Sequence, residues 1–163
     1  MNKNWSNTVL VAFSALPKIQ EELDFAFNSR LKSTFRSIHL KNGVSTEKLV
    51  KEMIEINERK RKTANLHLMV SAALNLVDEP EKRVLTARFI ENKTFQETAE
   101  TENISLRTVF RRFDRAQESF ACALRRQGMT EELFAEEYCT VPQIKAISER
   151  LDDSPYFAAK SQK

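Results

Sequence analysis

Residues 94–117 read TFQETAETENISLRTVFRRFDRAQ, and their pattern of charged and apolar residues is the most informative in the chain. All of its glutamates stand before residue 103, and all of its arginines stand after it. Apolar residues recur through both parts at the spacing of three and four that is typical of an amphipathic helix. The pattern predicts two short helices that share an apolar interior and differ in the charge of their outer faces.

The first of these helices has a clear start. Thr94 and Glu97 form a capping box, in which the Thr hydroxyl accepts a hydrogen bond from the third helical residue and the Glu carboxylate accepts one from the Thr N–H. Ala99, in the middle of the helix, is small enough to let a second helix cross at close range. The sequence therefore predicts a short helix that begins directly after Thr94.

The sequence also predicts the turn that follows. Asn103 stands where a left-handed residue is needed, and Asn is one of the few side chains besides Gly that adopts this conformation at modest cost. Ile104 fills the corner from inside, and Ser105 caps the second helix. The residues that face the core of this second helix are Val109, Phe113 and Ala116. This is helix-turn-helix spacing.

The arginines then project from the remaining sides of the second helix. Such a basic, exposed helix is typical of a reader of the major groove of double-stranded DNA. We expect Arg107 and Arg111 to reach base edges and Arg112 and Arg115 to hold the phosphate backbone, as residues 93 and 94 also do. The predicted DNA-binding residues are Lys93, Thr94, Ser105, Arg107, Thr108, Arg111, Arg112 and Arg115. The alternative is that these arginines only keep a surface helix soluble.

Residues 83–120 (RVLTARFIENKTFQETAETENISLRTVFRRFDRAQESF) resemble region 4 of bacterial sigma factors, especially the form found in small phage and prophage regulators of Gram-positive bacteria. Thr98 and Asn103 depart from the family, which favours Ile and Gly at these two places. The resemblance implies an all-α fold, promoter binding and RNA polymerase as a possible partner. No sigma region 2 is recognisable in residues 1–80. The resemblance rests on Leu85, Arg88, Phe89, residues 97–100, Ile104, Ser105, Thr108, Val109, Arg112, Arg115 and Ala116.

The rest of the chain divides into two further predicted parts. Residues 1–79 read as long helices with a role in oligomerisation or partner binding, residues 80–128 as the DNA-binding domain, and residues 129–163 as short acidic helices with a polar tail. Pro17 is expected in the first turn of a helix that runs to about Leu40 and ends at Asn42-Gly43. Its predicted apolar stripe is Phe27, Leu31, Phe35 and Ile38.

A second long helix is expected from Ser45 or Thr46 to about Val77. Its ERKRK stretch at residues 58–62 reads as a solvated face. The Asp78-Glu79-Pro80 sequence then caps and starts the helix that leads into the quoted stretch. Beyond that stretch, two weaker helices are expected at residues 130–138 and 142–151.

The composition agrees with an all-α chain. The 163 residues contain only two glycines and four prolines, with 41% hydrophobic and 30% charged residues. No apolar run approaches the roughly 20 residues that span a bilayer, so we expect no membrane contact and a cytoplasmic location. Cys122 and Cys139 stand outside any zinc or disulfide spacing, so no metal or cofactor is expected.

Charge is distributed unevenly along the chain. Residues 104–127 carry six arginines against two acids, a net charge of +4, whereas residues 129–153 carry seven acids against two cations, a net charge of −5. Opposite charges in adjacent segments attract each other. The sequence therefore suggests that the acidic segment folds back on the basic domain or docks a partner.

Three other functions remain to be weighed. Catalysis is disfavoured, because His39 and His67 have no obvious partner and no glycine-rich phosphate loop exists. A phage terminase small subunit, which binds packaging-site DNA as a ring, also combines a helix-turn-helix with long oligomerising helices. An adaptor that binds RNA polymerase without reading bases is the third possibility. The oligomeric state and DNA binding distinguish these alternatives from a promoter-binding regulator.

Overall fold

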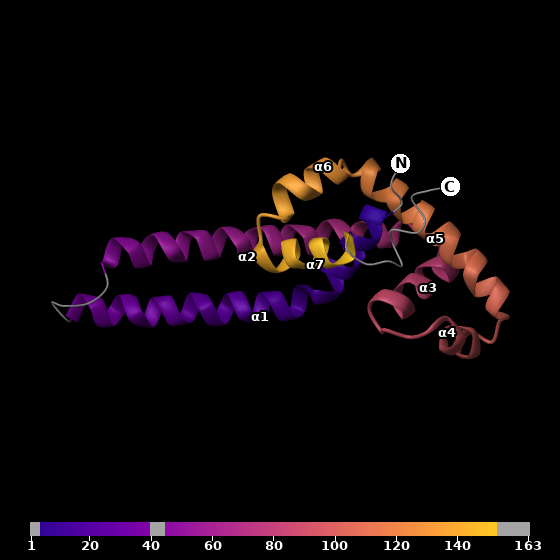
Figure 1. Ribbon diagram of the computed structural model, residues 1–163, viewed down its shortest axis with the longest axis horizontal. Helices are drawn as coiled ribbons and strands as arrows, with labels where there is room; N and C mark the ends of the chain where they lie inside the picture. Colours follow the sequence, from indigo (N-terminus) through magenta and orange to yellow (C-terminus); the bar gives the residue numbers. More distant parts are fainter. Residues whose placement is uncertain (1–3, 40–44, 153–163) are drawn as a thin grey trace. The chain divides into compact units, whose positions relative to one another are not determined.

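The computed structural model describes residues 4–39 and 45–152, which are helical apart from short connections (Figure 1). The predicted all-α fold is confirmed. The predicted helix stop at Asn42-Gly43 lies outside the described residues. The elements are α1 (Asn4–His39), α2 (Thr46–Asn75), α3 (Glu79–Phe89), α4 (Phe95–Glu102), α5 (Leu106–Arg126), α6 (Glu131–Leu133), the π-helix η1 (Phe134–Tyr138) and α7 (Pro142–Asp152).

The chain divides into two compact units. The hairpin unit is Ala15–Asn65, and the main unit comprises the described residues up to Ser14 and those from Leu66 onward. Both α1 and α2 therefore take part in both units. The predicted boundaries at residues 79 and 128 stay a prediction, while the contacts divide the chain at residues 14 and 65.

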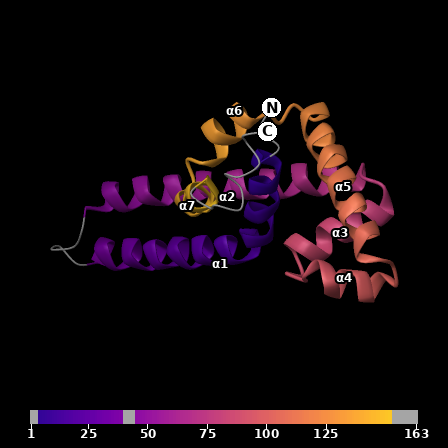
Figure 2. The same ribbon diagram turned by 45° about the vertical axis from the view of Figure 1, so that its right-hand side comes forward.

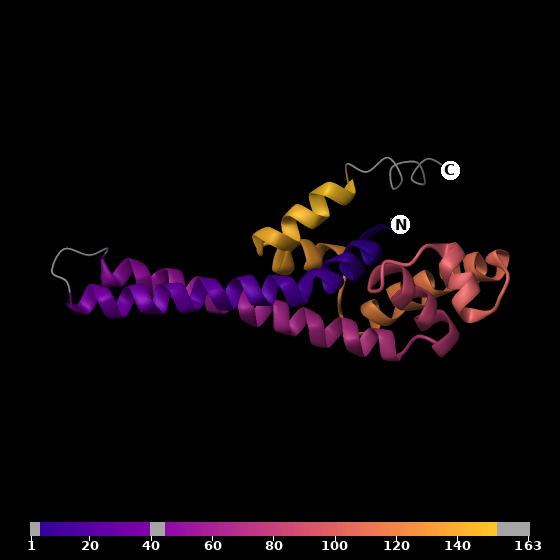
Figure 3. The ribbon, with the colours of Figure 1, turned by 90° about the horizontal axis from the view of Figure 1, so that it is seen from below.

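In the hairpin unit, α1 and α2 run side by side (Figure 3). Leu16, Ile19 and Leu23 of α1 are buried, as are Leu49 and Ile56 of α2. Ion pairs join the two helices, with 2.6 Å between Lys60 Nζ and Asp24 Oδ1 and 2.6 Å between Arg30 Nε and Glu52 Oε2. These cross-helix pairs fix which residues stand opposite each other in the hairpin.

The ERKRK stretch lies within α2 and forms a charged helical face, as predicted. Glu58 accepts hydrogen bonds from the guanidinium of Arg61 one turn later, and Arg59 pairs with Glu55 at 3.8 Å. The hydrogen bond from Arg61 and then its positive charge outweigh a small desolvation effect and hold the pKa of Glu58 below its ordinary value. These are contacts of a solvated helix surface, which contribute little to stability.

Two expectations for α1 are wrong. Pro17 lies inside the helix and not in its first turn, because α1 already begins at Asn4. Proline costs the helix one backbone hydrogen bond, but Leu16 and Ile19 on either side of it are buried and offset that loss. The expected apolar stripe is also displaced, since the side chain of Phe35 is 59% exposed whereas Leu23 is buried.

The main unit has a large apolar core at the C-terminal end of α5. Phe120 and Leu124 of α5 are fully buried, and so are Leu66 and Val70 of α2. Gln117 of α5 donates a hydrogen bond to Asn7 of α1 across 2.8 Å between Nε2 and Oδ1. The first residues of the chain thus pack with a helix that lies more than one hundred positions later.

The predicted helices at residues 130–138 and 142–151 are present as α6 with η1 and as α7. The acidic segment that they form is held by its apolar side chains. Phe134, Tyr138 and Ile144 are buried, and the Tyr138 hydroxyl donates to Met69 Sδ of α2 at 3.3 Å. The Tyr138 contact therefore joins this acidic segment to α2.

Candidate nucleic-acid interface

The first helix that holds the candidate interface in place is α3. Pro80 occupies its first turn, as predicted, and Val84 and Leu85 are fully buried. Asp78 stands at the N-cap position, but its side chain makes no capping hydrogen bond, so the predicted capping by Asp78 is wrong. Proline already fixes the first turn there, and the first N–H groups of a helix need no particular partner when they face water.

The capping box at the start of α4 is confirmed. The Glu97 N–H donates to Thr94 Oγ1 at 3.1 Å, and the Thr94 N–H donates to Glu97 Oε2 at 2.7 Å. The bond from the Thr94 N–H and then that from its hydroxyl hold the pKa of Glu97 below its ordinary value, against a small desolvation effect. A carboxylate therefore already occupies the N-terminus of α4.

The turn between α4 and α5 has the predicted geometry. Asn103 adopts the left-handed conformation at φ 53° and ψ 46°, and the Ile104 N–H donates to the Ala99 carbonyl at 3.0 Å. The Ser105 hydroxyl then caps α5 by accepting from the Thr108 N–H at 3.2 Å. Asn103 thus does the work of the glycine that sigma region 4 has at this place.

A small apolar centre holds together α3, α4 and α5, which lie next to one another in Figure 2. Val84 of α3, Ala99 of α4 and Val109 of α5 are buried together, and three partly buried side chains pack against them. These three side chains are Phe95, Ile104 and Phe113. The predicted core positions of the helix-turn-helix are therefore confirmed, although Phe113 is only partly buried.

Aromatic rings extend this centre. The Phe113 ring stacks on Phe89 at 6.1 Å between centroids and meets the edge of Phe95 at 4.9 Å. Phe95 also lies 4.9 Å from Phe110, on the next face of α5. The rings join α3, α4 and α5 in one layer, which fixes the direction in which α5 leaves the turn.

Three of the four predicted arginines lie on sides of α5 that face away from this centre. Arg107, Arg111 and Arg115 are exposed, and Arg112 is half-buried. Helical spacing places Arg107 and Arg111 one turn apart and opposite the buried Val109. None of the four makes an ion pair with a side chain that the structure describes. Their charge is available to an external anion.

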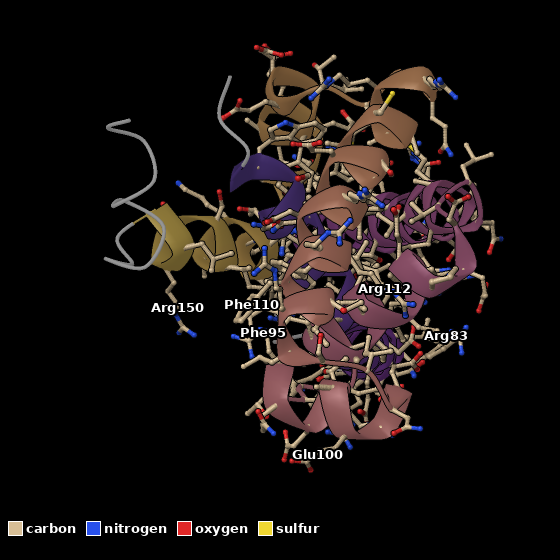
Figure 4. The ribbon with its side chains drawn as sticks, turned by 90° about the vertical axis from the view of Figure 1, so that its right-hand side faces the viewer. Arg83, Phe95, Glu100, Phe110, Arg112 and Arg150 are labelled. Atoms are coloured by element: carbon tan, nitrogen blue, oxygen red, sulfur yellow. The ribbon has the colours of Figure 1, made fainter. Side chains whose placement is uncertain are left out.

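Two different kinds of side chain lie on the two flanks of α5. Figure 4 shows Phe95 and Phe110 on one side of α5 and Arg112 on the other. Lys93 and Thr94 directly precede Phe95 in the sequence, at the start of α4. A helix inside the major groove has a phosphate backbone on each side. The arrangement suits such a position.

Four of the predicted DNA-binding residues already interact with other side chains of the protein. Both donors of Thr94 bond to Glu97, Lys93 Nζ pairs with Glu91 at 2.7 Å, and the Ser105 and Thr108 hydroxyls share a hydrogen bond of 2.8 Å. Their role in DNA binding stays a prediction. Of the predicted DNA-binding residues, Thr94 is the least suited to bind a phosphate, because both of its donors already bond to a negatively charged carboxylate.

Sequence reasoning assigned no binding role to Arg88 of α3. Its guanidinium lies over the Phe95 ring at 5.1 Å from the centroid, and its Nη1 donates to the Lys93 carbonyl at 3.4 Å. Arg88 is exposed and adds a cation beside the start of α4. No periodicity signals this contact, because it joins residues on two different helices.

The histidines and cysteines do not form a site among the described residues. His67 stacks on Phe13 at 5.3 Å, and the side chain of His39 lies outside the described ones. Cys122 and Cys139 form no disulfide bond with any described residue. No cluster of His, Cys, Asp and Glu that could hold a metal ion occurs in the described part of the chain.

None of the helices that the structure describes is long and apolar enough to cross a membrane.

Comparison with known proteins assigns the same region. The family model described as sigma-70, region 4 matches residues 67–118, which comprise the last turns of α2, all of α3 and α4, and the first half of α5. No curated protein and no solved structure matches the chain. The matched segment contains the arginine face of α5.

Proposed function

We propose that this chain, in which residues 67–118 form a sigma-70 region 4 helix-turn-helix, is a sequence-specific transcription regulator that binds promoter DNA. The recognition helix is α5, with Arg107 and Arg111 directed at base edges. Arg112 and Arg115 hold the phosphate backbone. Such a regulator acts in the cytoplasm and needs no cofactor.

The exposed arginine face of α5 carries this proposal. Three arginines are exposed on the outer side of α5 and a fourth, Arg112, is half-buried, and none of the four has an ion-pair partner among the described side chains. If these arginines only kept the helix soluble, nearby acidic side chains that pair with them would add stability. Such pairs are present for Arg30 and Arg61 in the hairpin unit. Guanidinium groups without internal partners are suited to guanine edges and to phosphates.

Promoter action is supported by the family of the motif and by its resemblance to small phage and prophage regulators. RNA polymerase is the partner that this family implies. The long helices of the hairpin unit offer surface for a second copy of the chain. A dimer therefore fits the proposal as well as a monomer does. A terminase-like ring and a polymerase adaptor are the two rival functions.

A selection experiment tests the proposal. The purified full chain is incubated with random duplex DNA, the bound fragments are sequenced, and binding isotherms are measured on the enriched duplex and on its scrambled version. We expect an enriched motif and tighter binding to the enriched duplex, typically by a factor of about 10³ or more. Failure to enrich any motif would count against sequence-specific binding.

Arg125→Ala is the matched control for Arg107→Ala. Both arginines are exposed on α5, but Arg125 lies in the last turn, remote in sequence from the turn of the motif. Only Arg107→Ala should lower the preference for the enriched duplex. Binding of polymerase without DNA would favour the adaptor, and a large ring seen by light scattering would favour the terminase.

A further inference from the structure

Two large apolar side chains at the start of α5, next to its core-facing side, are partly exposed. Leu106 is 39% exposed and Phe110 is 45% exposed. They stand four positions apart, so they lie one above the other on the same face of the helix. Together they form an apolar row along the first two turns of the recognition helix.

The row is held in place from behind. The Phe110 ring lies 4.9 Å from Phe95, tilted by 53°, and Phe95 packs on the buried centre of the motif. Leu106 borders a shallow depression at the turn, together with Gln96 and Ala99 of α4. The Phe110 ring is therefore anchored on one edge by Phe95, beside which it lies in Figure 4, while part of it and of Leu106 stays exposed.

The basic row of Arg107 and Arg111 runs directly beside it. Each arginine follows one of the two apolar residues in sequence, so the two rows lie side by side on α5. An apolar protein partner would have to desolvate both of these unpaired charges, which is costly. The major groove offers acceptors on guanine for arginine and the C5-methyl group of thymine for an apolar side chain.

We propose that Leu106 and Phe110 recognise thymine through its methyl group, at base pairs adjacent to those read by Arg107 and Arg111. The inference rests on the proposed function, since it deepens the assignment of α5 as the recognition helix. It adds a preference that arginine cannot supply. The two rows together select guanine beside thymine.

Replacement of thymine by deoxyuridine tests the proposal, because it removes the methyl group and keeps the base pair. Each thymine of the enriched duplex is replaced in turn, and binding of the full chain is measured. We expect one or two positions at which wild-type affinity falls about fourfold, the loss that corresponds to one methylene-sized apolar contact. Replacement outside the enriched motif serves as the control duplex.

Variants show which side chain makes the contact. Leu106→Ala or Phe110→Ala should bind the thymine and deoxyuridine duplexes equally well at the position that each side chain reads. Ile90→Ala is the matched control, because Ile90 is a 40% exposed apolar residue outside α5. It should keep the wild-type sensitivity to deoxyuridine.

The outcomes separate this inference from the proposed function. If the wild-type chain prefers its enriched duplex but tolerates deoxyuridine everywhere, or if the motif contains no thymine, methyl recognition is wrong while DNA reading stands. If no duplex is preferred at all, the proposed function fails first. A sensitivity to deoxyuridine that survives both alanine substitutions would also overturn the assignment to Leu106 and Phe110.

Discussion

Phe113 provides the sharpest test of the helix-turn-helix packing. Its ring meets Phe95 edge-on at 4.9 Å and stacks on Phe89 at 6.1 Å, against the buried Val109. Truncation of a fully buried Phe costs about 3 to 5 kcal/mol. Because the side chain is only partly buried, we take about half of that cost and add about 0.5 to 1.5 kcal/mol for the lost aromatic contacts. Phe113→Ala should therefore lower the free energy of unfolding by about 2 to 4 kcal/mol.

Urea unfolding followed by far-ultraviolet circular dichroism measures this loss. The midpoint should fall while the slope m stays constant, since the unfolded chain exposes nearly the same surface. Below the transition, the folded variant should bind the enriched duplex as tightly as the wild type, because the Phe113 ring packs against the core. A Phe113→Ala variant that unfolds like the wild type yet fails to bind DNA would refute the assignment.

Phe110→Ala is the matched comparison. Phe110 lies on the same helix and at the same 4.9 Å from Phe95, but it is 45% exposed. Its truncation should cost less stability than that of Phe113 and should alter DNA recognition. Phe113→Ala should thus mainly lower stability, and Phe110→Ala should mainly alter DNA recognition. A general disturbance of α5 would change both properties in both variants.

Three further predictions concern individual side chains. Arg107→Ala or Arg111→Ala should cost about 1 to 3 kcal/mol on the enriched duplex and less on a scrambled one, as measured by isotherms on both. Arg115→Ala should weaken binding to all sequences alike and lower the slope of log K against log salt by about one unit. The Thr94 N–H holds the pKa of Glu97 down, so its carboxylate stabilises the fold above its unfolded-state pKa and ceases to do so as the pH falls through the folded-state pKa. Glu97→Gln should thus have a lower urea midpoint than wild type at neutral pH, and the gap should close in acid.

The local features of the motif were predictable from the sequence because they depend on residues within one turn of each other. The capping box needs only Thr94 and Glu97, and the left-handed corner needs only Asn103, whose side chain tolerates that conformation. The sequence also argues against the predicted role of Thr94 as a phosphate contact. A Thr94 that is committed to a capping box has no free donor for phosphate.

Features that depend on distant packing were not predictable. Pro17 inside α1 is tolerated because Leu16 and Ile19 are buried, and the sequence does not show what covers them. Helical periodicity likewise places Leu106 and Phe110 together, beside the core-facing residues of α5. It does not show that part of each side chain stays exposed. Arg88 reaches Phe95 only because α3 and α4 meet at the loop between them.

The length of α5 limits how far the DNA-binding motif can be transplanted. This single helix of 21 residues begins in the small centre around Val109 and ends in the large core that contains Phe120 and Leu124. The small centre contains only three buried side chains, which are too few to compensate for the conformational entropy of some forty residues, so an excised motif would not fold by itself. Grafted onto another scaffold, the recognition helix would have to bring its C-terminal anchorage with it.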